Sequence, residues 1–193
     1  MNQEEHLLSP WIQGPFELIR HANEHLNLAG DTDRRIAFIG FDNAIEVCID
    51  VFLSLHPKVR GGVEIPNDET EKAKRNYHTK LEFFYKYVQD KKMAIELPIE
   101  DIIWYHQLRN QLYHSGNGLT PETHVLQGAK AAALVIFKSL FNFDVTLMLE
   151  NGTRKIDKIT NEILGQWLGE TINGLHSIGT KPPREGELIR NIL

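Results

Sequence analysis

Apolar residues recur at intervals of three and four positions along most of the chain, which is the spacing of one face of an α-helix. The pattern is clearest between residues 32 and 55, where the apolar positions are Phe38, Phe41, Ile45, Cys48, Phe52 and Leu55. No segment alternates between apolar and polar residues in the way that predicts a series of strands. The pattern therefore predicts an all-α protein.

Further helices follow from the same periodicity and from proline and glycine near the ends of the periodic segments. We expect them over residues 15–28, 68–92, 98–114 and 121–143. In the last of these, Thr120 is the expected cap and Pro121 the first helical residue. The short connections between helices predict a compact bundle with antiparallel neighbours.

We place this bundle in residues 1–150 and a C-terminal helical extension and tail in residues 151–193. Residues 144–149 fit either a continuation of a helix or a short strand. The extension contains a weaker helical pattern over 156–175, a linker rich in proline and glycine over 179–186, and a short amphipathic end.

Composition narrows the classes of function. The chain has 193 residues and a net charge of -5, so no global basic field attracts nucleic acid, and contact with RNA would need a local basic patch or a groove in a dimer. The single cysteine, Cys48, excludes an intrachain disulfide, and its position in the apolar pattern predicts a small core residue. A polar, acidic N-terminus and the lack of a long apolar run predict a cytoplasmic protein without membrane contact.

The densest group of reactive side chains lies at the end of the helix predicted over 98–114, in the segment Leu108–Gly116. Residues four apart share a helix face, so this segment has two neighbouring polar stripes. One stripe is His106, Asn110 and His114, and the other is Tyr105, Arg109 and Tyr113.

These residue types match the needs of RNA cleavage without a metal or another cofactor. The ribose 2′-hydroxyl is the nucleophile, so the protein has to supply a proton acceptor, a proton donor and positive charge for the phosphorane. His114 suits either proton role, Arg109 binds phosphate oxygens, and Asn110 positions an oxygen or the imidazole. Because one histidine cannot easily serve both sides of a phosphate, we expect a twofold homodimer that shares the site.

The spacing Arg109-Asn110-x-x-x-His114, near a helix end and followed by a long apolar helix, resembles the signature of HEPN domains. The resemblance covers residues 16–143. It implies an antiparallel all-α bundle, a homodimer and a metal-independent endoribonuclease in which Arg109 and His114 are catalytic and Asn110 is the polar helper. It also implies a role in toxin–antitoxin or antiphage systems, with an antitoxin or another protein as partner. Gly116 stands where some HEPN toxins have a tyrosine that a partner enzyme modifies, which argues against that regulation here.

Other interpretations of the same segment stay open. A non-catalytic HEPN-like module would use the cleft to bind a nucleotide, an RNA or a protein. Alternatively, Arg109 and His114 only cap the last carbonyl groups of a helix. For His106 and Tyr113 a packing role is favoured over contact with substrate.

The remaining candidates have an ordinary explanation on a solvated surface. Histidines at 21 and 25 around Glu24 match a zinc-protease spacing, but no further ligand is evident. Asp42, Glu46 and Asp50 form an acidic stripe, from which Glu46 is a weak candidate to orient Arg109 or His114. Lysines and arginines over 72–80 offer a weak basic patch, and Ser115–Gly118 a helix stop with a turn. The favoured interpretation of each is structural.

Overall fold

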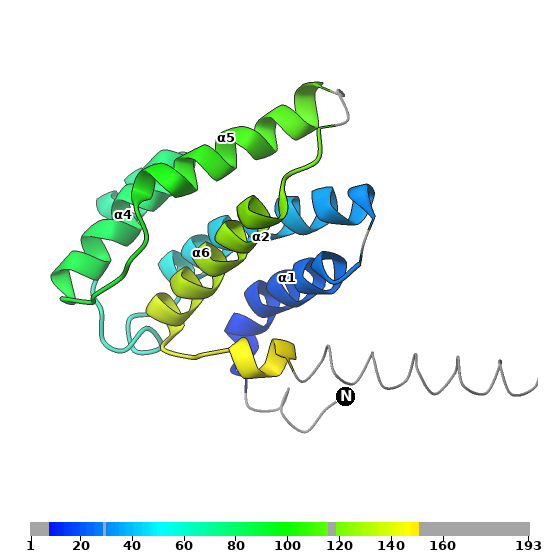
Figure 1. Ribbon diagram of the computed structural model, residues 1–193. Coiled ribbons are helices and arrows are strands. Elements are labelled where there is room, and N and C mark those ends of the chain that lie inside the picture. Colours follow the sequence, from blue (N-terminus) through cyan, green and yellow to red (C-terminus); the bar gives the residue numbers. More distant parts are fainter. Residues whose placement is uncertain (1–7, 29, 116–118, 151–193) are drawn as a thin grey trace, which may run out of the picture. The chain divides into compact units, whose positions relative to one another are not determined.

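The computed structural model describes residues 8–28, 30–115 and 119–150, and the following account concerns these residues. Their backbone is helical, with no strand in the described ranges, which confirms the all-α prediction. The elements are α1 (Pro10–Leu26), α2 (Asp31–Ser54), α3 (Asn67–Ala73), α4 (Tyr77–Asp90), α5 (Ile99–Ser115) and α6 (Thr123–Phe141), as labelled in Figure 1.

Backbone contacts divide the chain into the units Met1–Glu150 and Asn151–Leu193. The helix predicted over 156–175, the linker and the amphipathic end lie outside the described residues. Within the described part, no helix combines the length and the apolar character that crossing a membrane requires.

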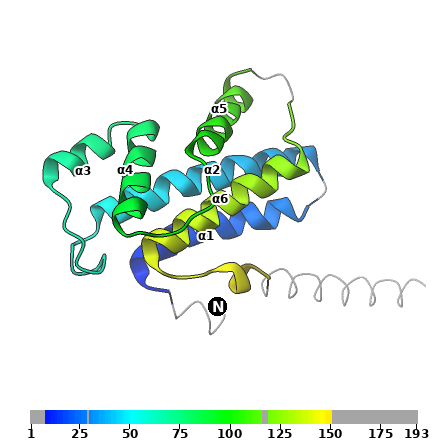
Figure 2. The same ribbon diagram turned by 60° about the vertical axis from the view of Figure 1, so that its left-hand side comes forward.

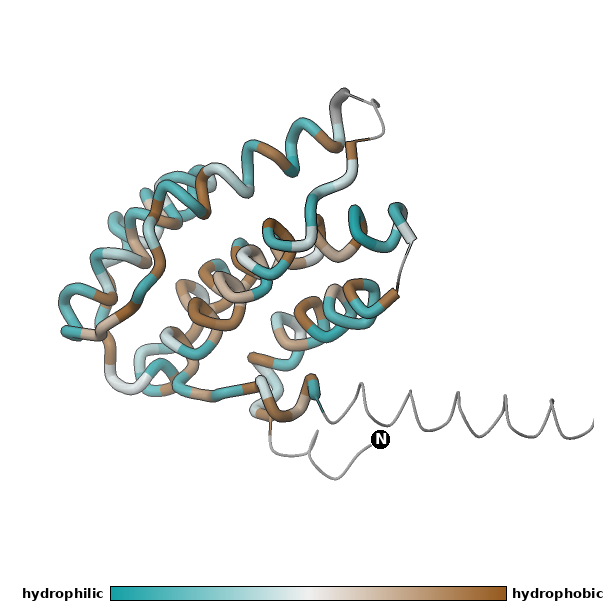
Figure 3. The backbone as a smooth tube through the Cα atoms, viewed as in Figure 1, coloured by the Kyte–Doolittle hydropathy of each residue, from teal (hydrophilic) through white to brown (hydrophobic). Residues whose placement is uncertain are grey.

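Helices α1, α2 and α6 lie side by side and contain most of the apolar core (Figures 1 and 2). The apolar stripe predicted on α2 is buried from Phe38 to Phe52, with Cys48 among the fully buried residues, as predicted. Figure 3 shows the matching apolar face of α6. At the contact between α1 and α2, a Cβ atom added to Gly40 would lie 2.8 Å from the Cβ of Ala22, so the two backbones approach closely here.

Helices α4 and α5 lie on the other side of α2 and α6 from α1 (Figure 1). The predicted apolar face of α4 is buried at Tyr77, Leu81, Phe84 and Val88. On α5, Ile102 is fully buried, whereas Leu108 and Leu112 are only partly buried. The end of α5 therefore has a thin apolar contact with the bundle, and polar contacts contribute much of its attachment.

The single helix predicted over 68–92 is wrong, because α3 and α4 are separate helices with a break at residues 74–76. Asn76 has an extended backbone, with φ of -158°, and its side chain accepts a hydrogen bond from the backbone N–H of Thr79. The hydroxyl of Thr79 in turn accepts from the backbone N–H of Asn76 at 3.2 Å. This reciprocal cap competes with continued helix and starts α4 anew.

The start of α6 also differs from the prediction, since it begins at Thr123 and not at Pro121. The side chain of Thr120 accepts hydrogen bonds from the guanidinium of Arg35, at 3.1 Å from Nη2. The carbonyl oxygen of Pro121 accepts from Nη2 of Arg34 at 2.5 Å. These contacts hold the residues before α6 against the start of α2 in a non-helical conformation.

The start of α1 differs from its prediction, and the open choice between helix and strand after α6 is decided. Helix α1 begins at Pro10, five residues earlier than predicted, and includes Pro15. Pro10 suits the first turn of a helix, and Pro15 removes only the hydrogen bond to the carbonyl of Trp11 near the helix start. Residues 146–150 are helical, which decides against a strand after α6.

Candidate functional site

The guanidinium of Arg109 is held by side chains from two helices. Its Nη2 donates a hydrogen bond to Oδ1 of Asn43 on α2 at 2.9 Å, and its Nη1 donates to Oδ1 of Asn110 at 3.0 Å. Its Nε lies 3.0 Å from Oδ2 of Asp42, as an ion pair without the alignment of a hydrogen bond. The side chain of Arg109 is 19% exposed, so part of it reaches the surface, and the side chains of Asp42, Asn43 and Asn110 fix its orientation.

Asp42 is fully buried and connects α2 to α4 and α5. Besides Arg109, its carboxylate accepts a hydrogen bond from the hydroxyl of Tyr77 at 3.1 Å and lies 3.0 Å from Nδ1 of His106. A buried carboxylate is tolerated only when it is paired and hydrogen-bonded, and these partners meet that need. Asp42 therefore organises the polar group beneath Arg109.

Tyr77 and His106 are packed face to face in this group. Their ring centroids lie 3.6 Å apart, and the ring planes are inclined by 13°. Burial raises the pKa of Tyr77 well above its usual value, and the negative charge of Asp42 raises it further. The phenol therefore stays protonated and serves as a hydrogen-bond donor to Asp42.

Tyr113 completes the described part of the site on the solvent side. Its ring centroid lies 5.5 Å from Cζ of Arg109, within the range of a cation–π contact. The residue is 60% exposed, so the packing role favoured from the sequence does not account for most of its surface. His106, for which a structural role was also favoured, packs on Tyr77 and shares Asp42 with Arg109.

The backbone of His114 belongs to the last turn of α5, within the limits Ile99–Ser115. Its side chain, the side chain of Ser115 and residues 116–118 lie outside the described residues. The structure thus brings together Arg109, Asn110, His106 and Tyr113 from the predicted set. The prediction that the His114 side chain joins Arg109 in one site stays a prediction.

The acidic stripe on α2 is not the solvated face that its sequence predicts, because Asp42 is fully buried and Glu46 and Asp50 pair with Lys80. Glu46 does not orient Arg109; its Oε1 lies 2.7 Å from Nζ of Lys80, and Asp50 lies 2.8 Å from the same atom. Asp42 is the residue that contacts Arg109. The sequence contains a signal for the burial of Asp42, which lies one residue after Phe41 and three before Ile45 in the apolar stripe of α2, but none for its contact with Arg109.

Lys80 was expected on a basic surface patch, but it is buried between α2 and α4. Burial by itself lowers the pKa of a lysine, yet the hydrogen bonds from Lys80 to Asp50 and Glu46 outweigh that effect and raise its pKa. Lys80 therefore stays charged as a structural cation. Lys80 therefore does not contribute to the weak basic patch over residues 72–80, for which a structural role is the favoured interpretation.

The zinc-protease spacing gains no further ligands from the fold. His25 Nδ1 lies 2.7 Å from Oδ1 of Asp33, and the side chain of His21 is 62% exposed. In the part of the chain that the structure describes, no three histidine, cysteine, aspartate or glutamate side chains are grouped closely enough to hold a metal ion.

The arrangement offers an oriented cation beside an exposed aromatic ring. A guanidinium has five N–H donors: the hydrogen bonds above use one on each Nη, and the buried Nε donor faces Asp42 without a hydrogen bond, which leaves the second donor of each Nη for an anion. Arginine binds phosphate oxygens through such parallel donors, and an exposed tyrosine ring can stack on a base. Comparison of the chain with known protein families, with curated proteins and with solved structures found no match.

Proposed function

We propose that this protein is a metal-independent endoribonuclease of the HEPN type. One observation carries the proposal: an arginine oriented by Asp42, Asn43 and Asn110 has donors left for a phosphate, and it lies beside an exposed tyrosine. The spacing from Arg109 to His114 adds a group that titrates near neutral pH.

In the proposed reaction, the ribose 2′-hydroxyl attacks the adjacent phosphorus and the bond to the 5′-oxygen breaks. His114 accepts the proton of the hydroxyl or donates one to the leaving oxygen, while Arg109 stabilises the charge of the phosphorane. The products have a 2′,3′-cyclic phosphate and a 5′-hydroxyl. Asn110 and Asn43 orient the guanidinium, and a second copy of the chain supplies the second histidine across a twofold axis.

The setting of Arg109 also supports a second candidate, a HEPN-like module that binds a nucleotide, an RNA or a protein without cleaving it. Each nitrogen of the guanidinium already lies close to a side-chain oxygen: Nε to Asp42, Nη2 to Asn43 and Nη1 to Asn110. Part of its charge is thus neutralised before any ligand arrives, which suits moderate binding better than strong stabilisation of a transition state.

The first prediction separates these candidates. The purified chain of residues 1–193, incubated with mixed RNA in EDTA, should cleave the RNA and leave cyclic phosphate and 5′-hydroxyl ends. His114→Ala should lower the rate at least a hundredfold, since general acid–base catalysis contributes about 10²–10⁴-fold. End-group analysis of the fragments and cleavage rates are the measurements.

The matched control is Arg20→Ala, an exposed arginine on α1, across α2 and α6 from α5, that should keep full activity. Arg109→Lys keeps the charge beside Asp42 but removes the planar pair of donors, and it should also lose activity. Binding of RNA without cleavage by the wild type would favour the binding module. Equal cleavage by wild type and His114→Ala would refute the assigned site.

We further propose that the cleavage acts in a toxin–antitoxin or antiphage system in the cytoplasm, with a protein partner that restrains it. Expression of the wild-type chain in a bacterial host should then arrest growth, and expression of His114→Ala should not. Equal growth under both conditions, with RNA cleavage established in vitro, would remove this role and leave the activity.

A further inference from the structure

A cavity lies at the opposite end of α2 from its first turn, away from the Arg109 site. Its volume is about 300 Å³, at the lower end of the range for small-molecule sites. The first turn of α1, the end of α2, the loop that follows it and the end of α6 all contribute to its walls.

Aromatic side chains form much of these walls. Phe52 is buried, with its ring centroid 6.3 Å from that of Phe141, and Phe143 is partly buried. Trp11 also lines the cavity and is 43% exposed, so a large apolar side chain stands with almost half of its surface open. Apolar walls of this kind favour a flat or extended apolar ligand.

Arg60 is the charged residue in the lining of this cavity. Its Nε donates to the carbonyl oxygen of Val63 at 2.8 Å, and its Nη1 lies 3.4 Å from the carbonyl oxygen of Leu53. These contacts hold the guanidinium in place but supply no negative charge. Among the described residues, Arg60 forms no ion pair.

In the part of the chain that the structure describes, no carboxylate lies close enough to Arg60 to be its counter-ion. The loop over residues 55–66 contains Lys58 as a second cation and Glu64 as its one acidic residue, and Glu64 is exposed and forms no ion pair with Arg60. On the α6 side, the carboxylate of Asp144 lies 2.8 Å from Nζ of Lys138, which already balances its charge. Within the described residues, an anionic group entering this cavity therefore meets a fixed guanidinium that no ion pair neutralises, with an aromatic wall beside it.

We propose that this cavity binds a small carboxylate with an apolar, preferably aromatic, body, whose carboxylate pairs with Arg60. The proposal is independent of ribonuclease activity. Arginine is suited to this role because its planar donors match the two oxygens of a carboxylate. Gly61 and Gly62, with φ of 71° and 79°, let the loop turn directly after Arg60 and keep it against the cavity.

Calorimetry on the full-length protein tests this with matched ligands, 2-naphthoate and its neutral analogue 2-naphthamide. We expect 2-naphthoate to bind at least tenfold more tightly than the amide, and more tightly than octanoate, because of the aromatic walls. In Arg60→Gln, the acid and the amide should bind within twofold of each other. Arg75→Gln, at an exposed arginine elsewhere, should keep the preference for the acid.

Val59→Asp gives a second test that does not disturb the anchored guanidinium, because Val59 lines the cavity but is exposed. Its carboxylate should weaken 2-naphthoate at least fivefold and leave 2-naphthamide within twofold. No binding of either naphthalene ligand, or equal binding of both by the wild type, would overturn the proposal. Tighter binding of octanoate would keep the carboxylate site and reject the aromatic preference.

Discussion

At the scale of single residues, the candidate site depends on one buried carboxylate. Asp42 contacts the Arg109 guanidinium, the His106 ring and the Tyr77 hydroxyl, which come from α5 and α4. Asp42 thus acts through other side chains and not on a substrate. It sets the direction of Arg109 and also holds neighbouring helices to α2.

Removal of this carboxylate should therefore cost stability. We expect Asp42→Ala to lower the free energy of unfolding by about 3 kcal/mol, because it leaves a partly buried guanidinium without its charge partner. Asp50→Ala removes a more exposed acidic partner of Lys80 and should cost about 1 kcal/mol or less. Urea unfolding of both variants is the measurement, and equal losses would show that Asp42 has no special position.

Tyr113 makes a separate prediction about RNA. Tyr113→Leu should weaken binding of a short single-stranded RNA about tenfold, because stacking of a base on an aromatic ring contributes about 1–3 kcal/mol. Tyr113→Trp should retain the affinity. Fluorescence anisotropy with a labelled oligonucleotide in EDTA is the measurement.

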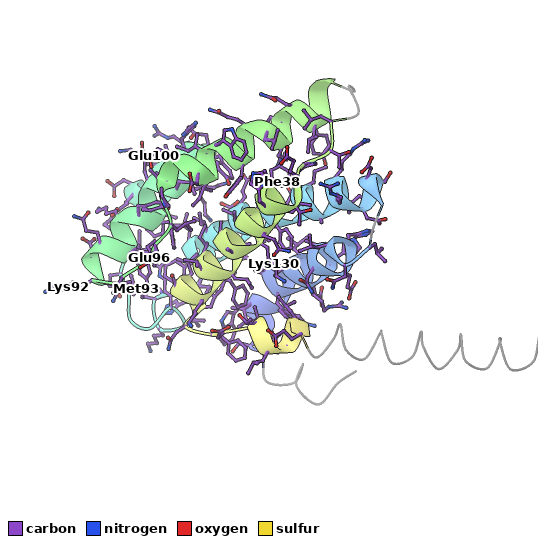
Figure 4. All side chains as sticks on the ribbon, viewed as in Figure 1. Phe38, Lys92, Met93, Glu96, Glu100 and Lys130 are labelled. Carbon is purple, nitrogen blue, oxygen red and sulfur yellow. The ribbon has the colours of Figure 1, made fainter. Side chains whose placement is uncertain are left out.

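Trp104 provides the matched control on the same helix. It is 49% exposed, but nine residues at about 100° per residue turn it to the opposite side of α5 from Tyr113. Its neighbours one turn earlier are Glu100, labelled in Figure 4, and Asp101, which repel phosphate. Trp104→Leu should leave the affinity within twofold, and an equal effect of both substitutions would argue against stacking at Tyr113.

At the scale of elements, helix periodicity located most helices and the loop after α2, because those segments pack one apolar face against a common core. The limits predicted for α2 and α5 agree with the structure to within a residue. Besides the early start of α1 at Pro10, the errors lie where side chains compete with the helical backbone, at Asn76 before α4 and at Thr120 before α6. The partner of Thr120 is Arg35, 85 residues away, and a local pattern contains no signal of such a contact.

In the candidate site, too, a local sequence pattern contains no signal of contacts between residues on different helices. Arg109, Asn110 and Tyr113 could be selected from the spacing within one helix. Asn43 and Asp42 could not be joined to them, because their contacts with Arg109 depend on how α5 lies on α2. The burial of Lys80 between acidic side chains depends likewise on the packing of α4 on α2.

The cap of α4 gives a prediction at this scale. Asn76→Ala should lower the free energy of unfolding by about 1 kcal/mol, since it leaves the N–H of Thr79 without its acceptor. Asn76→Ser retains an acceptor and should cost less than half as much. Thermal unfolding followed by circular dichroism compares them. A loss of equal size in both variants would mean that the cap is not the source of the effect.

At the scale of the whole described bundle, two kinds of contact hold the helices together. The contacts among α1, α2 and α6 are mainly apolar, with one hydrogen bond from Nζ of Lys130 to Oδ1 of Asn23, whereas α5 is joined to α2 largely through the polar group around Asp42. Apolar burial is insensitive to charge, but the polar group requires every partner to be in place. The two parts of the bundle should therefore differ in local stability.

Hydrogen exchange measures this difference directly. Backbone amides in the middle of α2 and α6 should exchange only through global unfolding, and those of α5 beyond Ile102 should exchange through local opening, at least tenfold faster. Asp42→Asn should increase the exchange of α5 more than that of α6. Equal protection from hydrogen exchange in α2, α5 and α6 would contradict the expected difference in local stability between the two parts of the bundle.

The close approach of α1 and α2 has a consequence for the variation that this sequence can accept. Alanine at position 40 would place its methyl group against the rigid Cβ and backbone of Ala22, so the helices would have to separate. At Gly128 the obstacle is the far end of the Tyr105 side chain, which can rotate away. In a saturation library selected for folded protein, position 128 should retain small residues besides glycine, while position 40 should retain glycine alone, and any relatives of this chain should carry the same invariant.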